Sequence, residues 1–402
     1  MRAWVLGAGA SKSYGASPTG QRMPIARDFF RTFQALDLYA NPWVLWTKLA
    51  GYLERTGRDP ESFLAGDVDI EELHSEIEAE YLPAVEDGEQ LLKVLTYGPY
   101  AELMFLFAAV VNAIQNGPLS AAHEKLAARM GPEDRVVTFN WDTLMDRALA
   151  TRTGWRPDWG YGIRPQSVFR DGWDTPSPAP TDPGPTVLKL HGSANWITSH
   201  TAFLREGLAL TQSSSPGTVY VFEHATRPYA AYAGRYMDGY EPFSYGYYPP
   251  NILDDAGRSA DPGYVLIQAR PKFPWIPEST TSDEGLVTMP LIIPPVKEKR
   301  YGMFGELFTT LWAQAEDALA TADEIVLIGY SFPHTDHRSN RLFLDAFSRR
   351  ATIPRVTLVD PAPDRIRDKF LYEFGIPETH LRVHPVYFTE TSFDDGSVVL
   401  QT

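Results

Sequence analysis

The stretch Ala3-Trp-Val-Leu-Gly-Ala-Gly-Ala-Ser11 decides the fold, because a short apolar run leads directly into two glycines. The apolar residues predict a buried strand. Glycine lets the backbone turn tightly, and the amide groups of a following helix can bind a pyrophosphate. The full dinucleotide-binding fingerprint has a third glycine at the position where this chain has Lys12. Two interpretations therefore stay open for this stretch, a nucleotide-binding loop and a simple tight turn.

Four further apolar runs end in a glycine or a polar residue in the same way. They are Arg135–Phe139 before Asn140, Val187–Leu190 before His191, Ile325–Ile328 before Gly329-Tyr-Ser331, and Arg355–Val359 before Asp360. Helical stripes separate these runs, and strands that alternate with helices predict an α/β fold. We expect a Rossmann-like, mostly parallel sheet with helices on both faces. Because ligands of such sheets bind beyond the carboxyl ends of the strands, the polar strand ends predict a nucleotide site.

The pattern divides the chain into one domain with two insertions. Residues 1–33, 131–197 and 286–402 carry the strands and are predicted to form the Rossmann-like domain. Residues 34–130 carry helical patterns and are predicted to form a helical insertion. Residues 198–285 are rich in tyrosine, proline and glycine with weak periodicity. This composition predicts an insertion with little regular structure, either a lid or a contact surface.

The composition excludes several classes of protein. A net charge of −15 and a pI near 5.1 give a surface that repels phosphate backbones, so we expect no direct nucleic-acid binding. The longest strictly apolar run, Leu103–Val111, is too short to span a bilayer, and we expect no membrane association. The chain has no cysteine, which excludes disulfides and cysteine-ligated zinc and fits a cytoplasmic protein.

Each polar motif also has a structural interpretation. Asn140-Trp-Asp142 lies at a junction between a strand and a helix, where asparagine and aspartate are preferred N-caps, so capping and ligand contact both stay open. His191 is followed by Gly192, which leaves space for a bulky group, but a histidine there can also be purely structural. His334, Asp336 and His337 lie close together without a fourth ligand in view. We interpret them as a solvated loop and expect no metal.

Taken together, these motifs resemble the sirtuin family. Gly7-Ala-Gly-Ala-Ser11 is similar to its first nucleotide loop, and Thr138-Phe-Asn-Trp-Asp142 resembles its Thr-Gln-Asn-x-Asp segment. Lys189-Leu-His-Gly192 resembles the catalytic His-Gly, and Gly329-Tyr-Ser331 stands where the family has Gly-Thr-Ser. The resemblance is greatest to the divergent bacterial sirtuin-like proteins. The stretches that carry this second resemblance are Gly9–Gly20, His191–Trp196, Pro294–Lys297 and Val356–Pro361.

The chain departs from the family in two places. The zinc module that four cysteines hold in the lysine deacylases is absent, and Pro18-Thr-Gly20 replaces the Gly-Ile-Pro-Asp-Phe-Arg segment. Both departures argue against protein deacylation. The resemblance to the bacterial branch implies an NAD hydrolase that releases nicotinamide and ADP-ribose and depletes NAD in anti-phage defence. An NAD-dependent deacylase, a dehydrogenase and a non-catalytic NAD or ADP-ribose sensor remain the alternatives.

The resemblance also implies a role for each candidate residue. Asn140 would position the attacking water, Asp142 would hold the carboxamide of nicotinamide, and His191 would contact the ribose hydroxyls. The other implied cofactor-binding residues lie around the diphosphate and the adenosine: Gly7, Ala8, Gly9, Ala10, Ser11, Thr19, Gly329, Ser331 and Asp360. NAD is then the substrate, and no metal is required.

A freely active NAD hydrolase would harm its own cell, so we expect gating by homo-oligomer formation or by a partner protein. A HerA-like ATPase is one such partner by family analogy. The sequence leaves open the trigger, the oligomeric state, the preference between NAD and NADP, and the roles of the two insertions.

Overall fold

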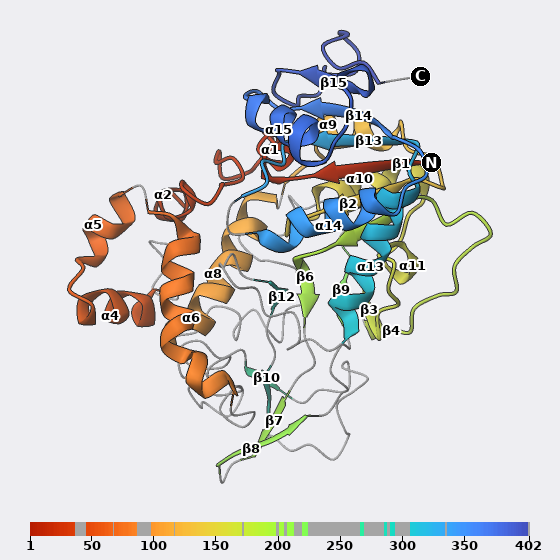
Figure 1. Ribbon diagram of the computed structural model, residues 1–402. Coiled ribbons are helices and arrows are strands. Elements are labelled where there is room, and N and C mark those ends of the chain that lie inside the picture. Colours follow the sequence, from red (N-terminus) through yellow and green to blue (C-terminus); the bar gives the residue numbers. More distant parts are fainter. Residues whose placement is uncertain are drawn as a thin grey trace.

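A six-stranded, all-parallel sheet forms the centre of the protein (Figure 1). The computed structural model describes residues 1–36, 46–66, 68–86, 98–115, 117–170, 173–197, 201–204, 207–212, 219–223, 266–268, 285–287, 290–293, 306–333 and 336–400. The strands of the sheet are β1 (Arg2–Leu6), β2 (Arg135–Thr138), β5 (Thr186–Lys189), β13 (Glu324–Ile328), β14 (Arg355–Val359) and β15 (Leu381–His384). The predicted α/β fold class is confirmed.

The order of the strands is β15-β14-β13-β1-β2-β5. If these strands are counted along the chain, the sheet therefore runs sixth, fifth, fourth, first, second, third. This is the order of the dinucleotide-binding Rossmann sheet, in which ligands bind where the order reverses. The reversal falls between β1 and β13, which pair in parallel from Arg2 with Glu324 to Leu6 with Ile328.

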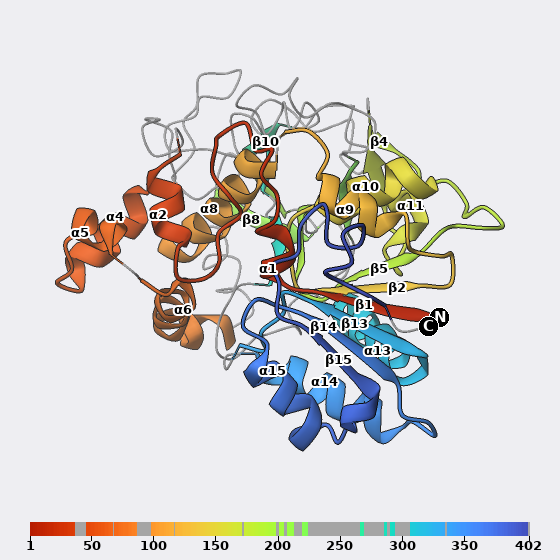
Figure 2. The ribbon, with the colours of Figure 1, turned by 90° about the horizontal axis from the view of Figure 1, so that it is seen from above.

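Helices cover both faces of the sheet (Figure 2). The helices α9 (Ala121–Ala127), α10 (Leu144–Thr153) and α11 (Pro157–Gly160) lie on one side, and α13 (Glu306–Thr321), α14 (His337–Ser348) and α15 (Asp364–Asp368) on the other. A π-helical turn, Lys369–Glu373, continues α15, and a 3₁₀ turn, Glu378–His380, precedes β15. Because strands covered on both sides bury every side chain, β13 is buried along its whole length and β1 from Ala3 to Leu6.

The five strands predicted from the sequence are all present, with bounds that differ by one residue at most. The edge strand β15 was not predicted. Its four residues are all partly exposed, so they form no apolar run that a pattern could reveal. The helix after β2 begins at Leu144 rather than directly after Asn140.

Two further sheets lie outside the sequence-based prediction. A five-stranded sheet has the order β12-β6-β9-β3-β4, and a four-stranded sheet has the order β10-β11-β7-β8. The strands are β3 (Ser167–Phe169), β4 (Trp173–Asp174), β6 (Gly192–Ile197), β7 (Thr201–Leu204), β8 (Gly207–Gln212), β9 (Tyr220–Phe222), β10 (Leu266–Gln268), β11 (Gly285–Val287) and β12 (Pro290–Ile292). Four of them fall within 198–285, where the sequence indicated little regular structure. The tyrosines between 229 and 248 lie outside the described residues.

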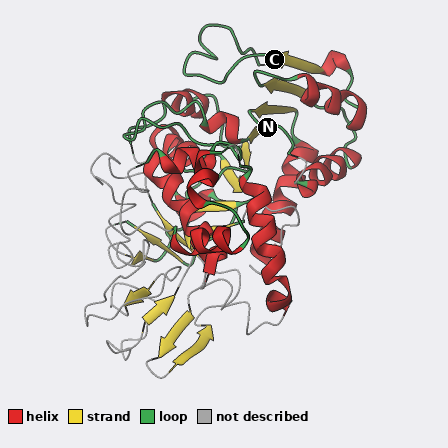
Figure 3. Cartoon of the chain, turned by 90° about the vertical axis from the view of Figure 1, so that its left-hand side faces the viewer, coloured by secondary structure: helices red, strands yellow, loops and turns green. Residues whose placement is uncertain are grey.

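Helices dominate the described residues between β1 and β2, as predicted. After the single turn α1 (Ala8–Ser11) they are α2 (Phe29–Gln34), α4 (Thr47–Arg55), α5 (Pro60–Ala65), α6 (Ile70–Glu86), α8 (Gly98–Gln115) and α9. Figure 3 looks onto the side where α2 to α8 lie. None of the helices described by the structure is both long and apolar enough to cross a membrane.

The burial of His74 between α6 and α8 predicts acid sensitivity. Its ring packs against Phe107 at 5.5 Å between centroids, and burial lowers the pKa of His74 from 6.5 to about 3. Below pH 6.5 His74 therefore binds a proton in the unfolded chain but not in the folded protein. This difference lowers the free energy of unfolding by up to about 1.4 kcal/mol per pH unit, until the pH reaches the folded pKa.

The variant His74→Leu is expected to lose less stability on acidification than the wild type. Urea unfolding at about pH 7.5 and about pH 4.5 measures the difference. An equal loss in both proteins would show that His74 does not contribute this proton uptake.

Candidate active site at the carboxyl edge of the sheet

The turns after β1 and β13 contact each other backbone to backbone, at the point where the strand order reverses. The Gly9 N–H donates to the Gly329 carbonyl at 3.0 Å. A Cβ added to Gly7 would lie 2.5 Å from that same carbonyl oxygen, and one added to Gly329 would lie 2.5 Å from the Ala10 nitrogen. The three glycines therefore allow the two turns to pack together. The sequence interpretation assigned the space beside Gly7 and Gly9 to a pyrophosphate, but the turn after β13 occupies it.

Asn140 joins the turn after β2 to the turn after β1. Its Nδ2 donates to the Gly7 carbonyl at 2.8 Å and to the Ser11 hydroxyl at 2.7 Å. Since a carbonyl can only accept, these bonds fix which end of the amide carries the nitrogen. The Ser11 hydroxyl in turn donates to Asp142 Oδ2 at 2.5 Å. Asn140, Ser11 and Asp142 thus form one chain of hydrogen bonds.

Neither Asn140 nor Asp142 is the N-cap of α10, a position that Thr143 holds, but Asp142 still satisfies a backbone N–H at the start of the helix. Asp142 Oδ1 accepts the backbone N–H of Leu144, the first residue of α10, at 3.0 Å. The amide of Asn140 is instead committed to the neighbouring turn. Within the described part of the chain, Asn140 Oδ1 accepts no hydrogen bond, and the residue is partly exposed. This oxygen is available to a ligand or a water.

His191 lies after β5 and faces a buried carboxylate from the other half of the sheet. Its Nε2 is 3.3 Å from Asp336 Oδ2, and the two residues are 8% and 2% exposed. Asp336 also caps α14 by accepting the Ser339 N–H at 3.2 Å. The edge of the Phe139 ring packs against the imidazole at 5.2 Å between centroids. The carboxylate and the Phe139 ring therefore both pack against the imidazole and help to fix its position.

The glycine after His191 does not make room for a ligand. Gly192 has a φ of +75°, and a Cβ there would collide with the Leu291 carbonyl of β12. The position is glycine because the chain turns sharply from His191 into β6 and passes directly beside β12.

The remaining predicted residues lie closer to the surface. Ser331 is exposed after β13, and its carbonyl accepts a hydrogen bond from Arg365. Asp360 follows β14 and accepts the Ala362 N–H at 2.9 Å. Thr19 is exposed in the loop after α1, where its hydroxyl bonds to Ser17 at 2.7 Å. Among the described residues, no hydrogen bond links Thr19 to the other predicted site residues.

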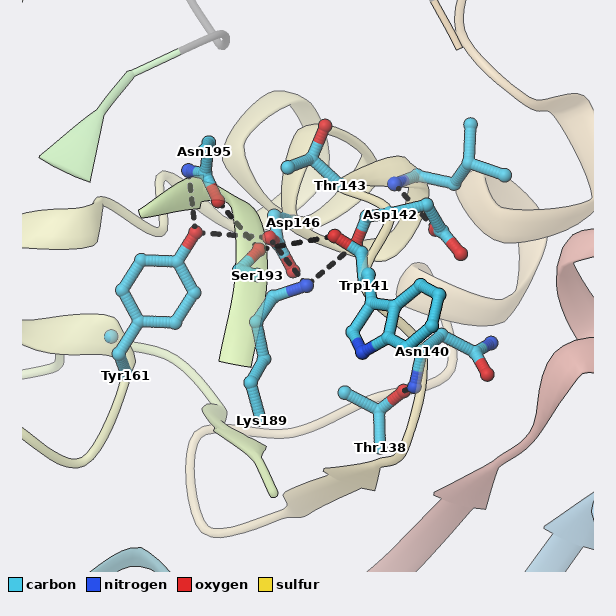
Figure 4. Close-up of polar contacts among 12 residues, drawn as sticks. Thr138, Asn140, Trp141, Asp142, Thr143, Asp146, Tyr161, Lys189, Ser193 and Asn195 are labelled. Atoms are coloured by element: carbon cyan, nitrogen blue, oxygen red, sulfur yellow. Dashed lines mark hydrogen bonds and ion pairs between the residues drawn. The ribbon is translucent and has the colours of Figure 1, made fainter. Parts of the chain in front are cut away.

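A ring of buried polar side chains supports the Asn140–Asp142 segment from behind (Figure 4). Lys189 Nζ donates to the Asp142 carbonyl at 2.5 Å and lies 3.2 Å from Asp146 Oδ2. Burial raises the pKa of Asp146, and the charge of Lys189 opposes that rise. Tyr161 donates to the same Asp146 oxygen at 2.9 Å.

Residues of β6 close the ring. Asn195 donates to the Tyr161 hydroxyl at 3.1 Å and accepts from Ser193 at 2.6 Å. The Ser193 hydroxyl lies 3.3 Å from the Trp141 carbonyl, which also accepts the Ala194 N–H at 2.8 Å. The carbonyls of Trp141 and Asp142, which follow Asn140, are therefore both held by hydrogen bonds from this ring.

Sequence analysis did not identify Lys189 or Asp336 as site residues. Lys189 interrupts the apolar run Val187–Leu190, and a charged residue in a buried strand signals a buried partner. Asp336 was considered only as a metal ligand, but its carboxylate is turned toward His191 and α14. His334 lies outside the described residues. In the ranges that the structure describes, no group of three or more histidines and carboxylates could hold a metal ion.

No protein-family model matches the sequence, and no curated protein matches it. The site is therefore interpreted from its own geometry.

The contact between the two glycine turns predicts a large effect for Gly329→Ala. The new Cβ would lie 2.5 Å from a backbone nitrogen, so the free energy of unfolding should fall by about 3 kcal/mol or more. Gly375→Ala is the matched control, because it has a similar φ of +69° but no atom within 4 Å of the added Cβ. Its cost should stay near 1 kcal/mol, that is, roughly the conformational term alone. Equal losses in urea unfolding would contradict the role assigned to the packing of the turns.

Proposed function

We propose that this protein binds NAD at the carboxyl edge of the central sheet and hydrolyses the bond between nicotinamide and ribose. One observation carries the proposal. The sheet has the strand order of dinucleotide-binding proteins. Asn140 follows β2, which pairs with β1, and His191 follows β5, which pairs with β2. Neighbouring strands lie about 4.8 Å apart, so these three strand ends fall within about 10 Å of one another.

The reaction needs little acid catalysis from the protein, because nicotinamide leaves NAD as a neutral molecule. The protein must hold the bond for cleavage, stabilise the positive charge that grows on the ribose, and direct a water at the anomeric carbon. Asn140 suits the last task through Oδ1, since both hydrogens of its amide are already donated to Gly7 and Ser11. By accepting a hydrogen bond from an O–H of the water, Oδ1 would turn a lone pair of that water toward the sugar.

His191 and Asp142 would complete the catalytic group. His191 would contact the ribose hydroxyls as a base or as an orienting group, with Asp336 stabilising the proton on its far nitrogen. Each oxygen of Asp142 accepts one hydrogen bond from the protein, which leaves each a lone pair for the amide of the nicotinamide group.

The turns around these residues would bind the rest of the dinucleotide. The exposed part of the Gly7–Ser11 turn, at Ala8, would take the diphosphate, and Ser331 and Asp360 would take the adenosine side. Asp360 lies half-buried after β14, where a carboxylate can accept from ribose hydroxyls. The mechanism uses NAD as substrate and needs no metal.

Depletion of NAD in anti-phage defence is the biological role that we propose for this reaction. Such an activity has to be restrained until it is needed, so we propose gating by self-assembly or by a partner such as a HerA-like ATPase. The specific activity should then rise with protein concentration or on addition of a co-encoded partner. Full activity of a dilute monomer would contradict this regulation.

Product analysis tests the proposed chemistry. Purified protein incubated with NAD, at high concentration or together with co-encoded proteins, should release nicotinamide and ADP-ribose in equal amounts, without NADH absorbance. Release of acyl groups from peptides faster than NAD hydrolysis would favour the deacylase, and NADH formation would favour a dehydrogenase. Tight NAD binding without any product would leave a sensor.

A substitution at Asn140 tests the proposed mechanism. Asn140→Ala should lower turnover about 100-fold or more, which corresponds to roughly 2.7 kcal/mol in the transition state. Binding of NAD, measured by calorimetry, should change little. Thr138→Val is the control, because the Thr138 hydroxyl accepts the backbone N–H of Asn140 at 3.1 Å and its loss loosens the same turn. If both variants lose turnover only in proportion to stability, Asn140 has a structural role alone.

A further inference from the structure

The C-terminal end of α8 contacts Thr143, the residue directly after the Asn140–Asp142 segment. Gln115 is fully buried, and its Oε1 accepts both the backbone N–H of Thr143 at 2.7 Å and the Thr143 hydroxyl at 3.1 Å. Thr143 is the residue that joins Asp142 to α10. One side-chain oxygen of the helical region thus holds the residue directly after the candidate catalytic segment.

A buried guanidinium reinforces this contact. Arg147 of α10 donates to the Gln115 carbonyl at 2.8 Å and to the Gly117 carbonyl at 2.6 Å. Burial lowers the pKa of Arg147 to about 10, so the group stays charged at neutral pH. Hydrogen bonds from a charged donor are the stronger ones, and these two fix the end of α8 against α10.

The same end of α8 contacts the loop after α1. The Tyr14 hydroxyl donates to the Pro118 carbonyl at 2.8 Å. A Cβ on Gly117 would lie 2.6 Å from that hydroxyl and 2.8 Å from Pro18. Gln115, Gly117 and Pro118 therefore lie between two candidate site loops, the one that holds Pro18 and the one that holds Asn140.

A third contact lies about two turns earlier on α8. The ring of Phe107 stacks on the ring of Trp141 with centroids 5.2 Å apart and an interplanar angle of 22°. Trp141 is the residue between Asn140 and Asp142. The helix thus contacts the segment at Trp141 by stacking and at Thr143 by hydrogen bonds.

We infer that Gln115 is a positioning residue, through which α8 sets the placement of Asn140 and Asp142 for the reaction. The effect on the reaction rests on the proposed function. The placement of the segment by Gln115 rests on the contacts alone. Removal of the Gln115 acceptor breaks both of these hydrogen bonds to Thr143 and so loosens the hold of α8 on the residue directly after Asp142. A displacement of about 1 Å at a reacting group can cost about 100-fold in rate, so the effect on turnover exceeds the effect on binding.

The neighbouring Asn112 provides a matched control on the same helix. Asn112 is 2% exposed and accepts the Gln115 Nε2–H at 2.5 Å, but no contact with Thr143 passes through it. Asn112→Leu therefore removes one buried hydrogen bond of α8 and leaves the Thr143 bonds in place. Gln115→Leu removes the bonds to Thr143 in a side chain of similar size.

A conservative variant tests for rescue. Gln115→Glu keeps an acceptor for Thr143 and replaces the donor that faces Asn112. The Nδ2 of Asn112 is buried without a hydrogen-bond partner among the described residues, so its amide can flip and donate to the new carboxylate. Gln115→Glu should retain the position of the segment.

Hydrogen exchange and kinetics on the full-length protein test the inference separately. In Gln115→Leu, peptides that cover residues 139–147 should exchange faster than in wild type, and kcat for NAD should fall about 10-fold or more with KM changed less than about 3-fold. Asn112→Leu and Gln115→Glu should keep both the exchange of these peptides and kcat within about 3-fold of wild type.

Two outcomes would overturn the positioning role. One is an unchanged exchange rate of residues 139–147 in Gln115→Leu, and the other is an equal loss of kcat in Gln115→Leu and Asn112→Leu. Absence of NAD turnover in the wild type, both at high concentration and with co-encoded proteins, would refute the proposed function instead, and the exchange comparison would still decide whether Gln115 holds the segment.

Discussion

The backbone contact between the turns after β1 and β13 is the constraint on which the rest of the structure depends. The strands on one side of this contact lead to Asn140 and His191, and those on the other side lead to Ser331, Asp336 and Asp360. The pair of His191 and Asp336 crosses from one half to the other. The Gly9 N–H donates directly to the Gly329 carbonyl. A side chain at Gly7, Gly9 or Gly329 would therefore separate the two groups of residues.

The segment from Asn140 to Thr143 is held from three directions. The side chain of Asn140 bonds to the turn after β1, Lys189 and Ser193 bond to backbone carbonyls behind it, and Gln115 bonds to Thr143. Buried polar networks of this kind rigidify a segment when their members are satisfied. A site that directs a water, rather than supplying a strong acid or base, needs such a rigid support.

Local patterns were sufficient to predict five of the six strands of the central sheet. An apolar run that ends in glycine or asparagine is visible within five or six residues, and parallel strands buried on both sides are made of such runs. The edge strand β15 escaped prediction because its residues are partly exposed, and most strands of the two smaller sheets because they have only two to four residues.

The side-chain contacts of the site could not be predicted in the same way. Asn140 is a plausible helix cap by its position, and only the approach of Gly7 and Ser11, about 130 residues away in sequence, gives its amide other partners. The glycines were correctly singled out, but their neighbours were not. The space beside Gly192 belongs to β12 and the space beside Gly7 to the turn after β13, and neither approach leaves a signal in the local sequence.

The position of β1 in the middle of the sheet also sets the order in which the protein can fold during its synthesis. Arg2 of β1 pairs with Glu324 of β13, and 322 positions separate them along the chain. At a synthesis rate of about 5 to 20 residues per second, β1 leaves the ribosome roughly 15 to 60 s before β13 exists. In that interval β1 can pair only with β2, and its other edge stays open. The turn with Gly329 and the carboxylate of Asp336 arrive last, so a nascent chain cannot assemble the complete site before most of the protein has been made.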